Sequence, residues 1–188
     1  TELAILEVAR GGILRRGLPI NSVAAALITN VASDHLGQYG INTVEELAET
    51  KFVVAKGLDT KGTLVLNADN TLVIEQGLKL DNKICWFSTD ESNALIQSHL
   101  KTGGAAVFMR NNHIVYATGN VEENIASLEQ VPMTLNGAAQ HNVQNALGVV
   151  GLSKALNLPT EAIRAGLKDF GSNAEDNPGR GNIYNVNG

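Results

Sequence analysis

The residues best suited to chemistry lie in one stretch, residues 29–51, which reads TNVASDHLGQYGINTVEELAETK. An apolar run at residues 23–28 precedes it and predicts a strand buried on both faces of a parallel sheet. Asn30, Asp34 and His35 follow that run, so they fall at the carboxyl end of the strand, where open α/β sheets bind their ligands. The sequence therefore predicts a functional site after this strand.

The same stretch contains a lysine in an unusual position. Thr43 and Glu46 form a capping-box pattern that predicts the start of a helix. Lys51 falls in the middle of that helix's apolar stripe, whereas Lys56 projects roughly 140° away from it. Because an unpaired buried ammonium is costly, Lys51 is either held for chemistry beside the strand-end loop or is a structural lysine that reaches solvent or pairs with Glu46 or Asp34. The apolar residues of the stripe are Val44, Leu47, Ala48, Ala55 and Leu58.

A second candidate group follows an earlier apolar run. Residues 3–6 predict a buried strand that ends at Glu7, whose carboxylate is either a surface group or a metal ligand. Residues 9–22 are long enough for a crossover to the next parallel strand. Glu7 is therefore expected at the same edge of the sheet as Asn30 and His35.

The rest of the chain indicates an α/β fold, with a mostly parallel sheet flanked by helices and a small antiparallel β subregion. After the parallel strands the pattern predicts an antiparallel hairpin, with Asn111 and Asn112 at its turn. The helix after Gln140 is apolar nearly all round and should be buried. The predicted strands are residues 62–67, 84–87, 105–109, 113–116 and 131–135, and the predicted helices are 71–78, 140–157 and 159–170.

Composition restricts the class of protein. The chain has 188 residues, 44% of them apolar and 18% charged, which is typical of a soluble globular protein. The net charge of −5 and the lack of a basic run argue against a nucleic-acid partner. No apolar run reaches the length of a membrane span, and Cys85, the only cysteine, cannot form an intrachain disulfide. We expect no membrane partner, a core position for Cys85 and a cytoplasmic location.

Taken in order, several motifs resemble those of the Mur ligase family, which are ATP-dependent, amide-forming ligases. The resemblance runs from Glu7 to Arg180 and makes the functional interpretation of Lys51 the stronger one. Two segments, ARGGILRRGL and DNPGRGN, are more similar to the family members that add arginine to poly-aspartate than to the peptidoglycan ligases. The other matching motifs are LEVARGG, TN-x-x-x-DHL, LNADN and HNVQNAL.

The resemblance implies a magnesium site and catalytic roles for His35 and Lys51. Glu7 and His35 match the strand-end residues that bind Mg²⁺, although Mg²⁺ usually prefers oxygen ligands. Lys51 matches the lysine that many members carbamylate with carbon dioxide, which creates an oxygen ligand for a second Mg²⁺. That reaction needs a neutral amine, the form that burial favours. Asp34 would interact with His35 and fix the orientation of its ring.

The resemblance also implies an ATP site. Asn142 and Asn145 match asparagines near the adenine, and Arg180 matches an arginine that reaches the phosphates, where a guanidinium suits bidentate contact. Asn30 matches the strand-end asparagine, with a less definite role in nucleotide binding.

The activity implied is carboxylate activation by ATP, followed by displacement of phosphate by an amine. The partners are then an amino-acid or peptide substrate, with arginine and poly-aspartate as the specific expectation. A ligase for another acid, such as a peptidoglycan precursor or poly-glutamate, is the enzymatic alternative. A binding or assembly module that kept the fold without catalysis is the alternative from another class.

The chain departs from the family in one respect, because it has no phosphate-binding glycine loop ending in G-K-[ST]. We therefore expect a fragment of a longer enzyme that is inactive alone and needs the missing N- and C-terminal parts of its own chain. Residues 1–174 would be the central ATP-binding domain, incomplete at its N-terminus, and residues 175–188 a linker and the first strand of a truncated C-terminal domain. A degenerate member, and assembly into a homo-oligomer, remain open.

Overall fold

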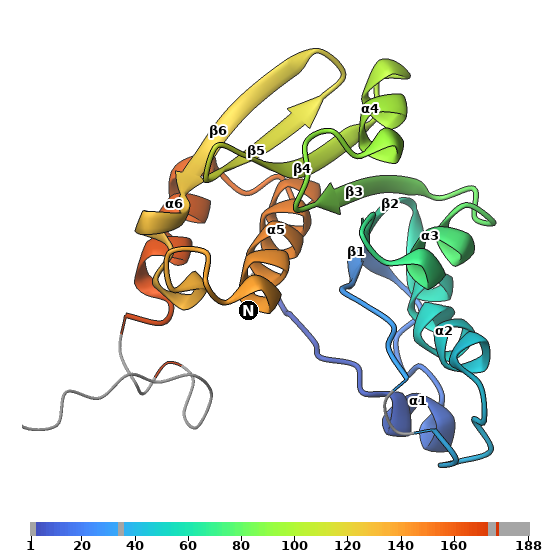
Figure 1. Cartoon of the computed structure of the whole chain (residues 1–188). Helices are drawn as coiled ribbons and strands as arrows, with labels where there is room; N and C mark the ends of the chain where they lie inside the picture. The colour runs from blue at the N-terminus through green and yellow to red at the C-terminus, as the bar shows by residue number, and fades with distance from the viewer. Residues whose placement is uncertain (1–2, 34–35, 173–175, 177–188) are drawn as a thin grey trace, which may run out of the picture.

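The computed structural model describes residues 3–33, 36–172 and 176, and contains one six-stranded sheet between two layers of helices (Figure 1). The strands are β1 Val23–Ile28, β2 Leu58–Asn67, β3 Lys83–Ser88, β4 Ala105–Arg110, β5 His113–Thr118 and β6 Val121–Ser127. The helices are α1 Arg10–Arg16, α2 Val44–Phe52, α3 Thr71–Gly77, α4 Ala94–Lys101, α5 Gln140–Ala155 and α6 Thr160–Asp169. Short 3₁₀ segments are η1 Val53–Gly57, η2 Leu128–Gln130 and η3 Pro132–Thr134.

The strands follow one another in chain order across the sheet. β1 to β4 pair in parallel, and β4, β5 and β6 pair antiparallel, which confirms the predicted mostly parallel α/β fold with a small antiparallel part. Because parallel strands end on the same side, the residues after β1, β2 and β3 share one edge, here called the carboxyl edge.

The central part of the sheet is buried on both faces, and alternate residues of its strands face opposite layers. Leu64, Leu66 and Trp86 pack in one core cluster with α2, α3 and α4. Val65 and Cys85 pack in the other, with α5 and α6. Cys85 is 2% exposed, which confirms its core position, and this burial raises the pKa of its thiol to about 12.

Two glycines let α5 approach the sheet closely. A Cβ added at Gly148 would lie 3.0 Å from the Leu27 side chain, and one at Gly151 would lie 2.7 Å from the Val65 side chain. The predicted burial of α5 is confirmed for the face that packs on the sheet between Val143 and Gly151, whereas Val149 is 45% exposed.

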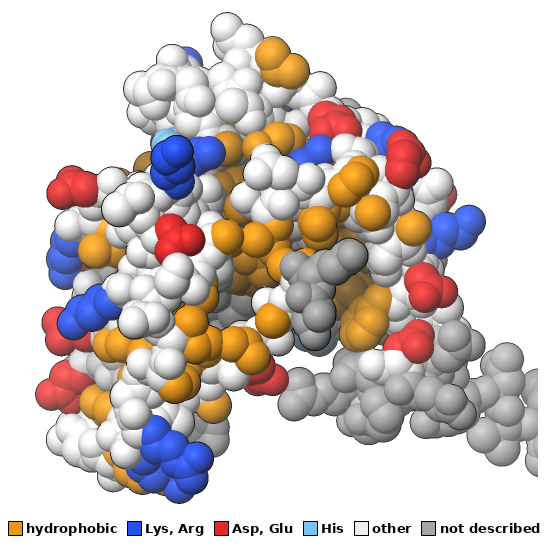
Figure 2. Space-filling view, turned by 180° about the vertical axis from the view of Figure 1, so that it is seen from behind, with side chains coloured by type: hydrophobic (Ala, Val, Ile, Leu, Met, Phe, Trp, Pro, Cys, Tyr) orange, Lys and Arg blue, Asp and Glu red, His pale blue; other side chains and the backbone are white. Residues whose placement is uncertain are grey.

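Figure 2 shows apolar side chains gathered around a hollow on the face opposite to that of Figure 1.

Three predictions about strands need correction. Residues 3–6 form no strand, and Ile5 and Leu6 are exposed, because the described part of the sheet offers this run no neighbouring strand. β1 is an edge strand of that sheet, so it is only partly buried and Ile28 alone among its residues is fully covered.

The third antiparallel strand is β6, not residues 131–135, which form η3 and end in a left-handed Leu135 with φ 50°. Pro132 lacks the N–H that a paired strand needs. β6 escaped prediction because its first half, which includes Glu122 and Glu123, is polar where the sheet edge meets solvent. The hairpin before it is confirmed, with its turn at Asn111 and Asn112 at φ 48° and 62°.

Within the described ranges 3–33, 36–172 and 176, no helix is long and apolar enough to cross a membrane.

Replacing Gly151 with alanine should destabilise the protein, because the new methyl group meets Val65 in a tightly packed core. Overpacking of this kind costs about 1–3 kcal/mol, which exceeds the gain of about 1 kcal/mol in helix propensity. Gly166→Ala in α6 is the matched control, since an added Cβ there has no neighbour within 4 Å. Urea denaturation should show a lower free energy of unfolding for Gly151→Ala and an equal or higher one for Gly166→Ala. Equal stabilisation by both would refute the close packing of α5.

Candidate active site

Three side chains at the carboxyl edge each donate a hydrogen bond to one of three consecutive backbone carbonyl groups. The bonds run from Asn67 Nδ2 to Thr29 O at 2.8 Å, from Lys51 Nζ to Asn30 O at 3.0 Å and from Asn70 Nδ2 to Val31 O at 2.9 Å. We call this arrangement the carbonyl clamp. It fixes the chain where it leaves β1, which is where the sequence predicts a functional site.

Two of the donors are held by their own turn after β2. Asn67 is the last residue of β2 and only 1% exposed, and its Oδ1 accepts a hydrogen bond from the Asp69 backbone N–H. Asn70 is the N-cap of α3, and its Oδ1 accepts from the Val73 N–H. In both side chains, the amide oxygen therefore accepts from a nearby backbone N–H, and the amide nitrogen donates to the segment that follows β1.

The third donor comes from α2. The helix begins with the predicted capping box of Thr43 and Glu46, and Lys51 lies in its last turn, half-buried, while Lys56 is exposed. The helix ends at Phe52, earlier than the apolar stripe suggested. The Glu46 carboxylate accepts from the backbone N–H groups before the helix, and the structure shows no ion pair between the described side chains of Glu46 and Lys51. Lys51 instead bonds to a carbonyl at the carboxyl edge.

The ends of β2 and β3 are fastened to one another through Asp69. Its carboxylate accepts from the Ser88 hydroxyl at 2.5 Å, and from the backbone N–H and the hydroxyl of Thr89 at 2.7 and 2.8 Å. Because all three bonds are to groups of the protein, the Asp69 carboxylate has a structural role: it holds the ends of β2 and β3 together.

α5 begins at the same edge, because Gln140 and Val143 line a cavity of about 270 Å³ together with Thr89. The predicted adenine residues lie in the first turns of this helix. Asn142 Nδ2 donates to Met133 O at 2.7 Å, and Asn145 Nδ2 donates to Asn142 Oδ1 at 3.4 Å. Asn142 is thus largely used in holding α5, and Asn145 is the freer of the two for a ligand.

The structure brings together only some of the predicted site residues. Asn30 meets Lys51, and Asn142 meets Asn145. Glu7 is exposed in the irregular segment before α1, and His35 and Arg180, like Asp34, lie outside the described residues. The convergence of Glu7, His35 and Lys51 therefore stays a prediction.

The next question is whether metal-ligating side chains gather anywhere in the described residues. Residues 3–33, 36–172 and 176 contain no group of three or more histidine, cysteine, aspartate or glutamate side chains placed to hold a metal ion. Glu7 offers carboxylate oxygens of the kind Mg²⁺ prefers, whereas a protonated Lys51 offers none.

Comparison with known proteins identifies the family of this chain. Residues 1–153 match the family model of the Mur ligase middle domain. The chain belongs to the Mur ligase family. It is 37% identical over 185 residues, 98% of its length, to cyanophycin synthetases from Synechocystis sp. and Nostoc sp.. It is also 31% identical to UDP-N-acetylmuramoylalanine–D-glutamate ligase from Chlorobium luteolum. That alignment of 152 residues covers 78% of this chain and 30% of the ligase.

The crystal structure of MurF from Acinetobacter baumannii has the same fold, with a TM-score of 0.51 at 20% identity over 78% of this chain and 28% of that one. This Mur ligase middle domain spans about a fifth of the length of the cyanophycin synthetases it matches, 21% for the Synechocystis sp. protein.

Sequence reasoning did not assign a role to Asn67 and Asn70. The signal was present in the LNADN motif, where two asparagines directly follow a predicted strand. Nothing in the sequence, however, shows which segment their side chains reach, because the acceptors Thr29 and Val31 lie 38 and 39 residues away.

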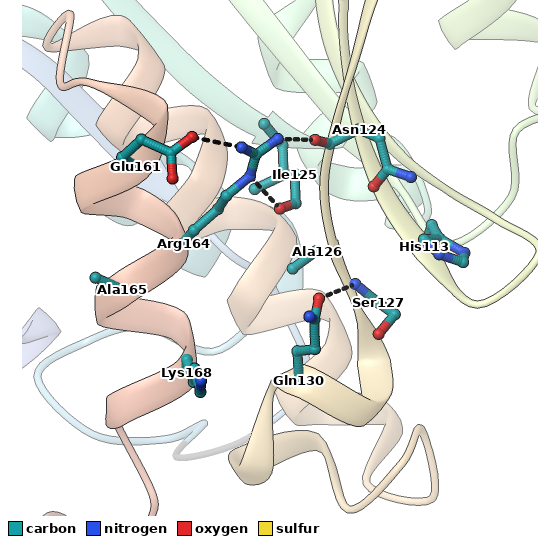
Figure 3. Close-up of a pocket in the computed structure, with 10 residues that line it drawn as sticks. All are labelled: His113, Asn124, Ile125, Ala126, Ser127, Gln130, Glu161, Arg164, Ala165 and Lys168. Carbon is teal, nitrogen blue, oxygen red and sulfur yellow. Dashed lines mark hydrogen bonds and ion pairs between the residues drawn. The ribbon is translucent and has the colours of Figure 1, made fainter.

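A larger hollow, of about 690 Å³, lies between β6 and α6 (Figure 3). Arg164 dominates it, donating to the carbonyls of Asn124 and Ile125 at 2.7 and 2.9 Å and to the Glu161 carboxylate at 2.6 Å. These bonds cover the open edge of β6, so Arg164 has a structural role. Within the part of the chain that the structure describes, none of the predicted site residues lines this hollow.

Lys51→Ala should leave this Mur ligase middle domain folded. The lost bond ends on a carbonyl of exposed Asn30, which water can reach, so we expect a loss of no more than about 1 kcal/mol in the free energy of unfolding. Urea denaturation followed by circular dichroism measures this, with Lys56→Ala as the exposed control.

A loss of roughly 3–5 kcal/mol on Lys51→Ala would contradict the assignment, because it is the cost of breaking a buried ion pair.

Proposed function

We propose that this chain is the ATP-binding middle part of an amide-forming ligase that joins arginine to the aspartate side chains of poly-aspartate. The observation that carries the proposal is the 37% identity to cyanophycin synthetases over 98% of the chain. The carbonyl clamp supports it, since it places Lys51 and Asn30 at the edge of the sheet where such folds bind ligands.

In the proposed reaction, a carboxylate oxygen of the acceptor attacks the γ-phosphorus of ATP and ADP leaves. The amine nitrogen of arginine then attacks the acyl carbon, phosphate leaves, and loss of a proton gives the amide. Such reactions depend mainly on positioning and on neutralising charge on the phosphoryl group. Mg²⁺ would supply part of that charge neutralisation when bound.

Each candidate residue has a proposed role in binding metal or nucleotide. We assign Glu7, His35 and a carbamylated Lys51 to magnesium binding. Asn145, with Asn142 behind it, would contact the adenine, and Arg180 would contact the phosphates. Asn30 would line the nucleotide site beside Lys51.

The parts that this chain lacks, including a phosphate-binding glycine loop, would come from other segments of a longer polypeptide. We therefore propose that the 188-residue chain is inactive by itself. Amide formation by the purified chain would contradict this.

A second candidate is a ligase for a peptidoglycan precursor, favoured by the 31% identity to a D-glutamate ligase. The two candidates differ in both substrates. The full polypeptide that contains this chain can be given ATP, Mg²⁺ and either arginine with poly-aspartate or D-glutamate with UDP-N-acetylmuramoylalanine.

We expect ADP release coupled to arginine incorporation in the first mixture only. Lys51→Ala should lower kcat at least about 100-fold, since it removes a group of the site, and Lys56→Ala should leave kcat within about twofold. Incorporation of D-glutamate would replace the proposal by the second candidate, and ATP-independent binding without turnover would favour a non-catalytic module.

A further inference from the structure

Asn67 and Asn70 hold the segment that leaves β1, yet neither belongs to the groups assigned above to nucleotide or metal. We propose that both are positioning residues: through the carbonyl clamp they fix residues 29–31 so that the Asn30 carbonyl meets the Lys51 amine and the Asn30 side chain stays at the carboxyl edge. The catalytic consequence rests on the proposed function, whereas the positioning itself rests on contacts alone.

The burial of Asn67 makes it the firmest part of the clamp. At 1% exposure its amide cannot turn to water, and its oxygen already accepts from the Asp69 N–H. Its nitrogen therefore depends on Thr29 O, since a buried polar group left without a partner costs more than an ordinary hydrogen bond contributes. The bond fixes the first carbonyl after β1.

Asn70 fixes the third carbonyl from the same turn. Its oxygen caps α3 and its nitrogen reaches Val31 O, so one side chain joins a helix start to the strand-end segment. Val31 is itself buried, at 4% exposure, in the core cluster with α2 and α3. With the carbonyls on both sides of Asn30 held, the Asn30 carbonyl has a defined position for the Lys51 amine.

This position matters for the chemistry proposed for Lys51. An amine that adds carbon dioxide becomes a carbamate, releases one proton and keeps one N–H. That N–H can still donate to Asn30 O, so the same bond that orients the amine would orient the carbamate. Asn67 and Asn70 would then set the direction of a group they do not touch.

The test uses variants that break the clamp while keeping local structure. Asn70→Ser keeps an oxygen that caps α3 but has no nitrogen to reach Val31 O. Asn67→Ala removes the buried donor, and Asn124→Ser, on exposed β6, is the control for the change of residue type. If Asn67→Ala does not fold, Asn70→Ser alone decides the question.

Two measurements on the chain need no activity. Amide hydrogen exchange in a peptide covering residues 29–33 should be about two- to twelvefold faster in both clamp variants, as expected for one net hydrogen bond, and unchanged in Asn124→Ser. The ¹³Cε resonance of Lys51 should shift in the clamp variants and not in the control. Unchanged exchange and an unchanged Lys51 resonance would overturn the proposal.

In the full polypeptide, the clamp variants should lower kcat by about tenfold or more with a smaller change in KM for ATP. An active enzyme whose kcat does not respond to either variant would overturn the positioning role. A wild-type polypeptide without ligase activity, in which exchange and the Lys51 resonance still respond, would uphold the clamp and overturn the proposed function instead.

Discussion

Three hydrogen bonds to the consecutive carbonyls of Thr29, Asn30 and Val31 join the end of the parallel sheet to the helix that carries Lys51. The chain of dependence begins in the core. β2 is buried by helices on both faces, which fixes Asn67 at its end. Asn67 and the cap of α3 then hold the segment after β1, and that segment offers a carbonyl to the Lys51 amine. The position of Lys51 thus depends on the packing of the whole sheet.

Much of this fold could be predicted from the sequence because local patterns and tertiary contacts agree. Continuous apolar runs marked β2 and β3, the pattern of Thr43 and Glu46 marked the start of α2, and two asparagines marked the hairpin turn. The predictions that failed depended on a neighbour. Residues 3–6 are apolar enough for a strand but have no strand beside them in the described sheet, and the polar first half of β6 pairs on one side only.

The candidate site was predictable in its location and only partly in its contacts. The strand end and the helix stripe allowed a position for Lys51 beside the loop that contains Asn30, and the structure shows that contact. The roles of Asn67 and Asn70 do not follow from the sequence, because bonds between a side chain and a distant backbone carbonyl leave no periodic signal. The structure also shows polar groups that the fold uses, such as Asp69 and Arg164, whereas Asn145 makes only a long side-chain hydrogen bond, to Asn142 at 3.4 Å. Whether the predicted metal ligands converge at the carboxyl edge is the central question.

Paramagnetic broadening by Mn²⁺, used in place of Mg²⁺ on the isotope-labelled chain, addresses that question most directly. If the carboxyl edge is the metal site, small additions of Mn²⁺ should broaden the resonances of Glu7, Asn30, His35 and Lys51 first. Those of His113 and Lys168, which line the hollow between β6 and α6, should remain sharp. Broadening that begins at His113 and Lys168, or that is uniform along the acidic surface, would contradict a metal site at the carboxyl edge.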